Sequence, residues 1–208
     1  MALRRSLLQF LTFSSAIPLA TNKPALILVP DAFHRASVYD EVKAQLGAAG
    51  YGHISAVDLP SGDNGIADVE RTADNNIVIG LLETRLKNGE DVILVGSSYG
   101  ATAIMEAVED FEDRSAIFVP ENTRGEGQIL GLIMLSGYIP TVAEVNHDPS
   151  RPYIRGIGAP FFNYHLSATD TPTTVTWALD LVTYTPQITF YNLLDAPEAD
   201  YWTSPQKA

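Results

Sequence analysis

Cysteine is absent from this chain of 208 residues. Without a thiol, these residues cannot form a disulfide, a thiolate nucleophile, a cysteine-ligated zinc site or an iron–sulfur cluster. Basic residues are scarce as well: 13 Lys and Arg stand against 25 Asp and Glu, and the formal net charge is −12 at pH 7. Because so acidic a chain repels phosphate backbones, we expect no nucleic acid among its partners.

Long apolar runs are also missing. No stretch approaches the roughly 20 apolar residues that a transmembrane helix needs, so we expect no membrane span. Apolar residues nevertheless make up 46% of the chain, which matches the globular average and excludes a wholly disordered protein. A chain of this length is expected to form one domain, which we assign to residues 23–208.

The first 22 residues have two interpretations. Arg4 and Arg5 precede a short, mostly apolar run, and the small residues Ser14 and Ala16 stand at a candidate cleavage position. These are the parts of a secretory signal peptide. The alternative is an ordinary leader ahead of the first strand. The localisation is therefore left open between secreted and cytoplasmic.

The next part of the chain alternates between two kinds of apolar pattern. Continuous or short apolar runs predict strands, and apolar residues at helical spacing predict helices between them. The expected strands are residues 25–30, 53–57, 91–95 and 129–135, and the expected helices are residues 38–49, a long pattern that ends at Leu86, and residues 101–111. This alternation favours an α/β fold with a parallel sheet and helices on both faces.

The alternation ends after Pro140. Residues 141–172 are rich in proline and show little periodicity, and residues 187–202 are rich in aromatic side chains. Between them, one further helix is predicted by the spacing of Val175, Ala178, Leu179 and Val182. We interpret residues 141–202 as a cap or lid. Its aromatic side chains either shape an apolar pocket or belong to an ordinary core: Phe161, Phe162, Tyr164 and Trp177.

One motif carries chemistry. Residues 96–100 read Gly-Ser-Ser-Tyr-Gly, a G-x-S-x-G pattern between an expected strand and an expected helix. Such a turn aims the hydroxyl of its central serine, here Ser98, out of the carboxyl edge of the sheet. The two glycines are needed because the strand and the helix pass too close together for a Cβ atom. The start of the helix offers N–H groups and a positive dipole end to an oxyanion. The alternative is a glycine-rich turn without chemistry.

Three stretches of the sequence carry a resemblance to a known family. They read LVPDAFH at residues 28–34, VDLP at residues 57–60 and VGSSYGA at residues 95–101. Together they resemble the α/β-hydrolase superfamily, particularly its small fungal and plant-esterase-like members. The segment at residues 190–202 is similar to the end of the cap in fungal relatives.

The resemblance implies roles for five residues. Ser98 would be the nucleophile, and the backbone N–H groups of Tyr99 and Ala32 would form the oxyanion hole. Phe33 and His34 would contact the substrate, because they belong to the loop that lies nearest Ser98 in the family. The resemblance implies no cofactor and no metal.

The chain departs from the family pattern in two places. Pro30 and Asp31 stand where the family has a His-Gly pair. In the family an acid and then a histidine follow the serine along the chain, after strands that lie beyond the cap. This sequence stops at Ala208, directly after the cap-like segment, so we expect both strands and both partners to be absent.

Other side chains are candidates for the missing partners. His147 and His165 follow Ser98 and either could reach it, because catalytic triads are defined by geometry and not by chain order. The alternative for both is a solvated loop histidine. His53, at the start of a strand, is expected to be structural or exposed. Three acids are more readily interpreted as surface charges: Asp58, Glu144 and Asp148.

Three functions remain compatible with these residues. The first is a serine hydrolase for a small, apolar carboxylic ester or lactone, with an unusual base or with its C-terminal part missing. The alternatives are a catalytically impaired protein that binds a hydrophobic ligand, and a non-hydrolytic enzyme of the lyase or cyclase type. A parallel sheet that stops after four or five strands leaves an apolar edge, so we expect either a homo-oligomer or a rearranged cap.

Overall fold

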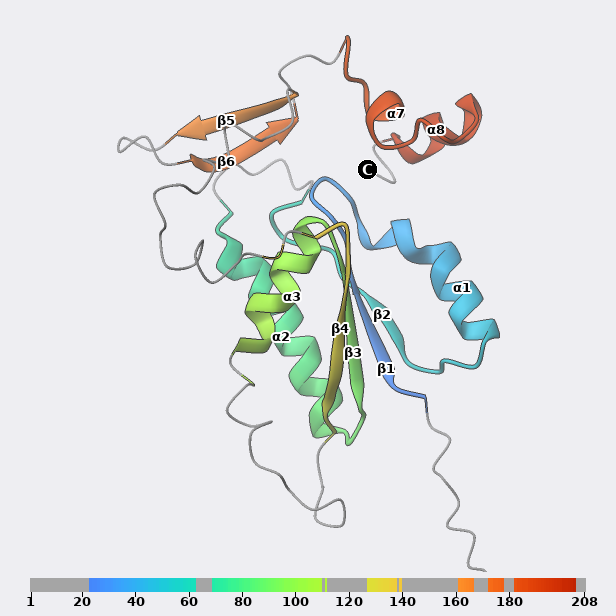
Figure 1. Ribbon diagram of the computed structural model, residues 1–208, viewed down its shortest axis with the longest axis vertical. Coiled ribbons are helices and arrows are strands. Elements are labelled where there is room, and N and C mark those ends of the chain that lie inside the picture. The colour runs from blue at the N-terminus through green and yellow to red at the C-terminus, as the bar shows by residue number, and fades with distance from the viewer. Residues whose placement is uncertain are drawn as a thin grey trace, which may run out of the picture.

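The computed structural model describes residues 23–62, 69–109, 111, 127–137, 139, 161–166, 172–177 and 182–204. The predictions for the leader at residues 1–22 and for Glu144, His147 and Asp148 concern residues outside this set. The described elements form a sheet flanked by helices, with a smaller C-terminal part above one end of the sheet (Figure 1).

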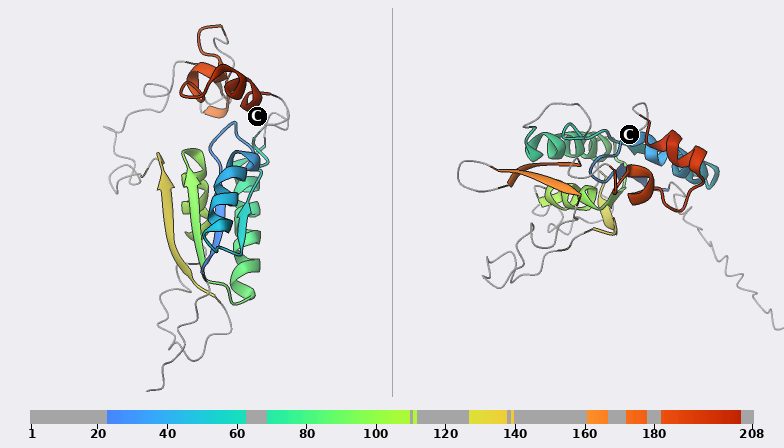
Figure 2. Two further views of the ribbon diagram at one scale, coloured as in Figure 1. Left: turned by 90° about the vertical axis from the view of Figure 1, so that its right-hand side faces the viewer. Right: turned by 90° about the horizontal axis from the view of Figure 1, so that it is seen from above.

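A parallel sheet forms the centre of the fold. Its strands are β1 (Ala25–Val29), β2 (Ile54–Ala56), β3 (Val92–Ser97) and β4 (Ile129–Leu135), in the order β2-β1-β3-β4. Every neighbouring pair is parallel, and the left view of Figure 2 displays the strands side by side with the yellow β4 at one edge. The predicted parallel sheet is confirmed. Strand β2 is shorter than the strand expected at residues 53–57.

Helices cover both faces of this sheet, as the sequence predicts. The short helix η1 (Ala36–Tyr39) and α1 (Asp40–Ala48) lie on one face, whereas α2 (Arg71–Lys87) and α3 (Tyr99–Glu109) lie on the other (Figure 1). Strand β1 is buried along its whole length because both faces are covered. Its side chains alternate between two cores: Ala25, Ile27 and Val29 pack with α2 and α3, and Leu26 and Leu28 pack with Tyr39.

The first helix differs from its predicted pattern. The sequence predicts a single apolar stripe over residues 38–49, but Val38 lies in η1 and α1 begins only at Asp40. A 3₁₀ turn has fewer residues per turn than an α-helix, so it changes the phase of the stripe. As a result Val42 is 44% exposed, and only Leu46 of α1 packs against the core, where it is half-buried.

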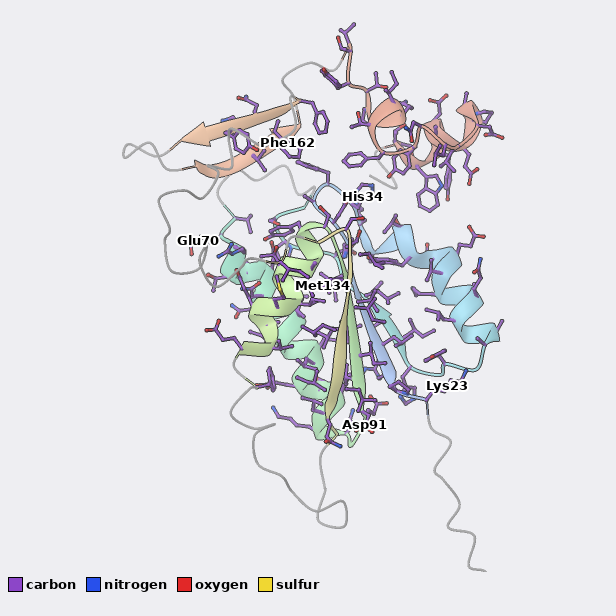
Figure 3. All side chains as sticks on the ribbon, in the orientation of Figure 1. Lys23, His34, Glu70, Asp91, Met134 and Phe162 are labelled. Atoms are coloured by element: carbon purple, nitrogen blue, oxygen red, sulfur yellow. The ribbon has the colours of Figure 1, made fainter. Side chains whose placement is uncertain are left out.

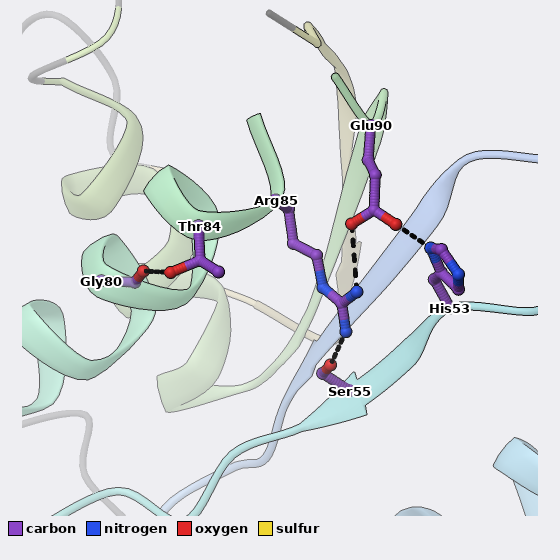
Figure 4. Close-up of polar contacts among 6 residues, drawn as sticks. All are labelled: His53, Ser55, Gly80, Thr84, Arg85 and Glu90. Carbon is purple, nitrogen blue, oxygen red and sulfur yellow. Dashed lines mark hydrogen bonds and ion pairs between the residues drawn. The ribbon is translucent and has the colours of Figure 1, made fainter. Parts of the chain in front are cut away.

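Polar contacts join the elements at the amino edge of the sheet (Figure 4). Arg85, near the end of α2, donates to the carboxylate of Glu90 at 3.0 Å and to the hydroxyl of Ser55 at 2.9 Å. Glu90 also forms an ion pair with His53, whose side chain is 60% exposed. The prediction that His53 is structural or exposed is confirmed. It lies at the end of the sheet opposite Ser98.

The C-terminal part contains a hairpin and two short helices. Strands β5 (Phe162–Leu166) and β6 (Pro172–Trp177) pair antiparallel, and α7 (Pro186–Thr189) and α8 (Ala196–Trp202) follow. Both helices begin at a capping side chain, Thr185 for α7 and Asp195 for α8. All four elements lie above the carboxyl edge of the main sheet (Figure 1). This is the position expected of a cap.

The helix predicted from Val175 to Val182 is wrong over residues 175–177, which belong to β6, and residues 178–181 lie outside the described residues. Residues 173–176 read Thr-Thr-Val-Thr, and β-branched side chains of this kind favour a strand. The helical spacing of the apolar residues did not outweigh this local preference. Pairing with β5 then satisfies the backbone hydrogen bonds that an isolated strand would leave open.

One edge of the main sheet exposes apolar side chains. In β4, Leu130, Ile133 and Leu135 are 53%, 47% and 46% exposed, in agreement with the apolar edge that the sequence predicts. Among the described residues, no helix is both long enough and apolar enough to cross a membrane.

Candidate active site

The turn between β3 and α3 holds Ser98 in an unusual backbone conformation. Its φ angle is +47°, in the left-handed region that residues other than glycine rarely adopt. Two backbone hydrogen bonds stabilise this conformation: the Ser98 N–H donates to the carbonyl of Leu135 at 2.9 Å, and the Ala101 N–H donates to the carbonyl of Ser98 at 3.0 Å. The Ser98 side chain is exposed at the carboxyl edge of the sheet.

Glycines on both sides allow this turn to form. A Cβ atom on Gly96 would lie under 3.0 Å from the backbone of Gly100, and one on Gly100 would lie under 3.0 Å from the carbonyl oxygens of Val29 and Pro30. Real Cβ atoms essentially never come so close to another atom. The strand, the turn and the helix are therefore packed backbone against backbone, as the sequence predicts for the G-x-S-x-G pattern.

The loop after β1 lies beside this turn. Strands β1 and β3 are parallel neighbours, so the segments that follow them emerge at the same edge of the sheet. The close packing of Gly100 on Val29 and Pro30 brings the two segments into contact, two residues before Ala32. Within the loop, Phe33 also has a left-handed φ angle, +71°. Strained residues thus stand in both segments at this edge.

His34 is held firmly in the loop. It is 9% exposed, its Nδ1 forms an ion pair with the carboxylate of Asp31, and the same nitrogen lies 3.2 Å from the carbonyl oxygen of Ala32. Because both neighbours of Nδ1 are acceptors, Nδ1 carries a proton and Nε2 is left for another partner. Burial alone lowers the pKa of His34, but the hydrogen bond and the charge of Asp31 outweigh it, and the pKa is raised.

This raised pKa predicts a pH-dependent stability. The free energy of unfolding of a His34→Gln variant should fall furthest below that of the wild type at about pH 5. At that pH His34 is protonated in both the folded and the unfolded state. The difference in free energy of unfolding should shrink as the pH rises from the unfolded value of 6.5 through the higher folded pKa. Urea unfolding of both proteins at several pH values measures this difference in free energy of unfolding. A difference that stays constant with pH would contradict the assigned ion pair.

Aromatic side chains of the C-terminal part cover the loop. The ring of His34 lies 4.7 Å from that of Phe190 and 5.7 Å from that of Tyr191, and Phe33 lies 5.8 Å from Phe162. Figure 3 displays His34 and Phe162 together at the end of the sheet opposite Lys23 and Asp91. Phe162 in turn packs on two further rings, those of Phe161 and Tyr164. The loop and the C-terminal part thus form one aromatic cluster at the carboxyl edge.

The charge of Asp31 acts on two nearby tyrosines. Burial, together with the negative charge of Asp31, raises the pKa of Tyr39 and of Tyr191 to about 12. Tyr39 donates its hydroxyl to the carbonyl of Val29 at 3.0 Å, so it supports the end of β1 from below the loop. Both tyrosines are therefore neutral hydrogen-bond donors across the physiological pH range.

Two other sequence candidates have exposed side chains. His165 stands on β5 with an exposed side chain. Asp58, exposed after β2, accepts a hydrogen bond of 2.6 Å from the backbone of Ala36, so it is a surface charge that also fixes the start of η1. The side chain of Trp177 is outside the described residues.

One polar residue at this edge escaped the sequence analysis. Asp74 on α2 is completely buried, and its carboxylate accepts hydrogen bonds from the backbone and hydroxyl of Ser61, at 2.8 and 2.5 Å, and from the hydroxyl of Tyr99 at 2.6 Å. The sequence does contain a clue. Asp74 stands four residues before Val78 in the series Asp74, Val78, Leu82 and Leu86, all of which are buried.

The described residues contain no group of three or more His, Cys, Asp or Glu side chains that could hold a metal ion. The geometry at this edge instead combines an exposed serine hydroxyl, the N-terminus of α3 and an aromatic cluster. A helix N-terminus leaves its first N–H groups without intrahelical acceptors, so it can bind a negatively charged oxygen.

Comparisons with known proteins agree with the fold. The alpha/beta hydrolase nvfD of Aspergillus novofumigatus is 30% identical over 122 residues, which are 59% of this chain and 46% of nvfD. The crystal structure of tomato methylketone synthase I in complex with 2-tridecanone has a TM-score of 0.54 at 20% identity, over 80% of this chain and 61% of that one. The chain thus spans about half the length of nvfD and 61% of that of the synthase.

A family model gives the broadest match. The model of the alpha/beta hydrolase family matches residues 26–207, which include β1, the loop after it, the turn at Ser98 and the C-terminal elements. The parallel sheet, the covered faces and the strand–turn–helix around Ser98 all fall within this match. This chain belongs to the alpha/beta hydrolase family.

Proposed function

We propose that the chain carries the acyl-transfer site of a serine hydrolase that acts on a small, apolar carboxylic ester or lactone. The conformation of Ser98 is the observation that carries this proposal. The residue stands at a left-handed turn between a parallel strand and a helix, with its side chain exposed. A strained and exposed serine at the start of a helix is the arrangement that nucleophilic attack requires.

The proposed reaction has two steps. The Ser98 hydroxyl loses its proton to a base and attacks the carbonyl carbon, and the carbonyl oxygen becomes an oxyanion that accepts hydrogen bonds from the N–H groups of Tyr99 and Ala32. The C–O bond then breaks, the leaving oxygen takes up the proton, and an acyl-enzyme remains. In the second step, water loses a proton to the base and attacks the acyl-enzyme carbonyl. The bond to Ser98 breaks, the carboxylic acid is released, and the Ser98 hydroxyl takes up the proton.

The base is proposed to be a neutral histidine. His147 and His165 are the candidates from the sequence, and we add His34 as a third, because its Nδ1 contacts the carboxylate of Asp31 and its Nε2 could take the proton. A carboxylate that fixes one ring nitrogen while the other takes a proton is the role of the acid in a triad. Single alanine variants of these three histidines separate the candidates.

The aromatic cluster supports an apolar substrate. Phe33 and His34 of the loop pack against Phe162 and Phe190 of the cap, directly above the carboxyl edge where Ser98 lies. Aromatic rings bind apolar acyl or alcohol groups by burying their surface. An uncharged ester or lactone of small size fits such surroundings better than a polyanion does.

Covalent labelling with a fluorophosphonate, read by intact mass, tests the proposal. The wild type is expected to gain one adduct, and Ser98→Ala to gain none. Ser97→Ala is the matched control, since it removes the neighbouring hydroxyl and should still be labelled. Labelling that persists in Ser98→Ala would assign the reaction to another residue. A folded wild type without any adduct would reject the hydrolase and favour a binding protein or a lyase-type or cyclase-type enzyme.

A further inference from the structure

We propose that Asp74 is a positioning residue for this site: through the hydroxyl of Tyr99 it fixes the peptide whose N–H would bind the oxyanion. This inference rests on the proposed function and deepens it, because it assigns a role to a residue outside the motif. Asp74 stands in the first turn of α2 and belongs to none of the three stretches that resemble the family.

The contacts of Asp74 join two segments at the carboxyl edge. Ser61, which follows β2, donates both its backbone N–H and its hydroxyl, and Tyr99, which follows β3, donates its hydroxyl at 2.6 Å. A carboxylate without solvent exposure is costly unless donors surround it. These three donors and the positive end of the α2 dipole compensate for that cost. The hydrogen bonds at this edge are therefore centred on the buried carboxylate of Asp74.

The contact with Tyr99 does more than hold two helices together. Helices α2 and α3 are already joined further along by Glu106, which accepts from Asn75 at 2.6 Å and pairs with Arg71 at 2.9 Å. The Asp74–Tyr99 contact differs from these because it reaches the first residue of α3, next to Ser98. A purely structural link between the helices would not need to end there.

Two constraints then fix the peptide between Ser98 and Tyr99. On one side, the backbone of Gly100 is pressed against Val29 and Pro30. On the other, the Tyr99 ring is anchored at its hydroxyl to the buried carboxylate. Loss of the anchor allows the peptide to turn. An oxyanion-hole donor that is misplaced by a fraction of an ångström stabilises the transition state less.

The effect should appear in kcat and not in KM. The oxyanion forms only after attack, so a displaced N–H weakens the transition state while leaving ground-state binding unchanged. Burial and the hydrogen bond with Asp74 raise the pKa of Tyr99, so the hydroxyl stays protonated and continues to donate throughout the working pH range.

Steady-state hydrolysis of p-nitrophenyl acetate and the rate of fluorophosphonate labelling test the role. Tyr99→Phe removes only the hydroxyl, and kcat is expected to fall about tenfold with KM unchanged. Asp74→Asn should lower kcat by a similar factor. The double variant should lower kcat no further than either single variant, since all three variants break the same Asp74–Tyr99 contact. The labelling rate should fall by the same factor.

Glu106→Gln is the matched control. It weakens the other link between α2 and α3, so the midpoint of urea unfolding should fall while kcat stays at the wild-type value. If Tyr99→Phe also lowers only the unfolding midpoint, Asp74 is structural and the inference is overturned. If Asp74→Asn does not fold, Tyr99→Phe carries the test by itself. A wild type that is neither labelled nor active would overturn the proposed function instead, which distinguishes the two failures.

Discussion

Gly100→Ala is expected to lower the free energy of unfolding by more than about 3 kcal/mol, or to prevent folding. The added Cβ atom would lie under 3.0 Å from the carbonyl oxygens of Val29 and Pro30. Both obstacles are backbone atoms of a buried strand end, so no side-chain rotation relieves the clash. Strand β1 and helix α3 would have to move apart, and the turn at Ser98 would open with them.

Gly80→Ala is the control for this substitution. Gly80 lies in α2, and a Cβ atom there would meet nothing within 4 Å. Since alanine favours a helix over glycine, this variant should be stabilised by about 0.5–1 kcal/mol. Urea unfolding followed by circular dichroism measures both variants. If Gly100→Ala were as stable as the wild type, the close packing between β1 and α3 would not exist in solution.

Leu82→Ala is expected to lower the free energy of unfolding by about 2–5 kcal/mol. Leu82 is 0% exposed and belongs to the core between the sheet and the helices α2 and α3. Truncation removes the apolar surface that the side chain buries and leaves a cavity. Its neighbours along the helix face, Val78 and Leu86, are themselves fixed by packing and cannot fill the space.

Leu193→Ala provides the comparison for this prediction. Leu193 is 93% exposed, so its truncation should change the free energy of unfolding by less than about 0.5 kcal/mol. The same urea titration serves for both variants. Equal losses in the two would mean that α2 does not pack on the sheet as described.

The described strands of the main sheet and the helices α2 and α3 could be predicted well from the sequence because their signals are local. The run Ala25–Val29 is apolar at every position, as a strand covered on both faces requires, and the helix from Tyr99 to Glu109 has its apolar residues at helical spacing. The G-x-S-x-G pattern predicted both the turn at Ser98 and the close approach at its glycines. An apolar edge was also predicted, because the expected parallel sheet stops after four or five strands, and the structure places it at β4.

The C-terminal part was less predictable because its apolar spacing and its local preference disagree. Val175 fits a helical series with residues further on, yet its β-branched neighbours favour the strand that pairs with β5. The phase of α1 was likewise altered by a 3₁₀ turn that no spacing rule anticipates. Short elements of this kind take their conformation from what they pair with or pack on.

By itself, the sequence determined the order of the elements, the parallel sheet and the position of the candidate nucleophile, since periodicity and glycine spacing are properties of neighbouring residues. Only the tertiary structure decided the surroundings of that residue. It brought Asp74 to Tyr99 across 25 positions and His34 to Phe190 across the whole domain. Such contacts depend on which loops emerge at the same edge of a sheet, and that is settled by the packing of the whole fold.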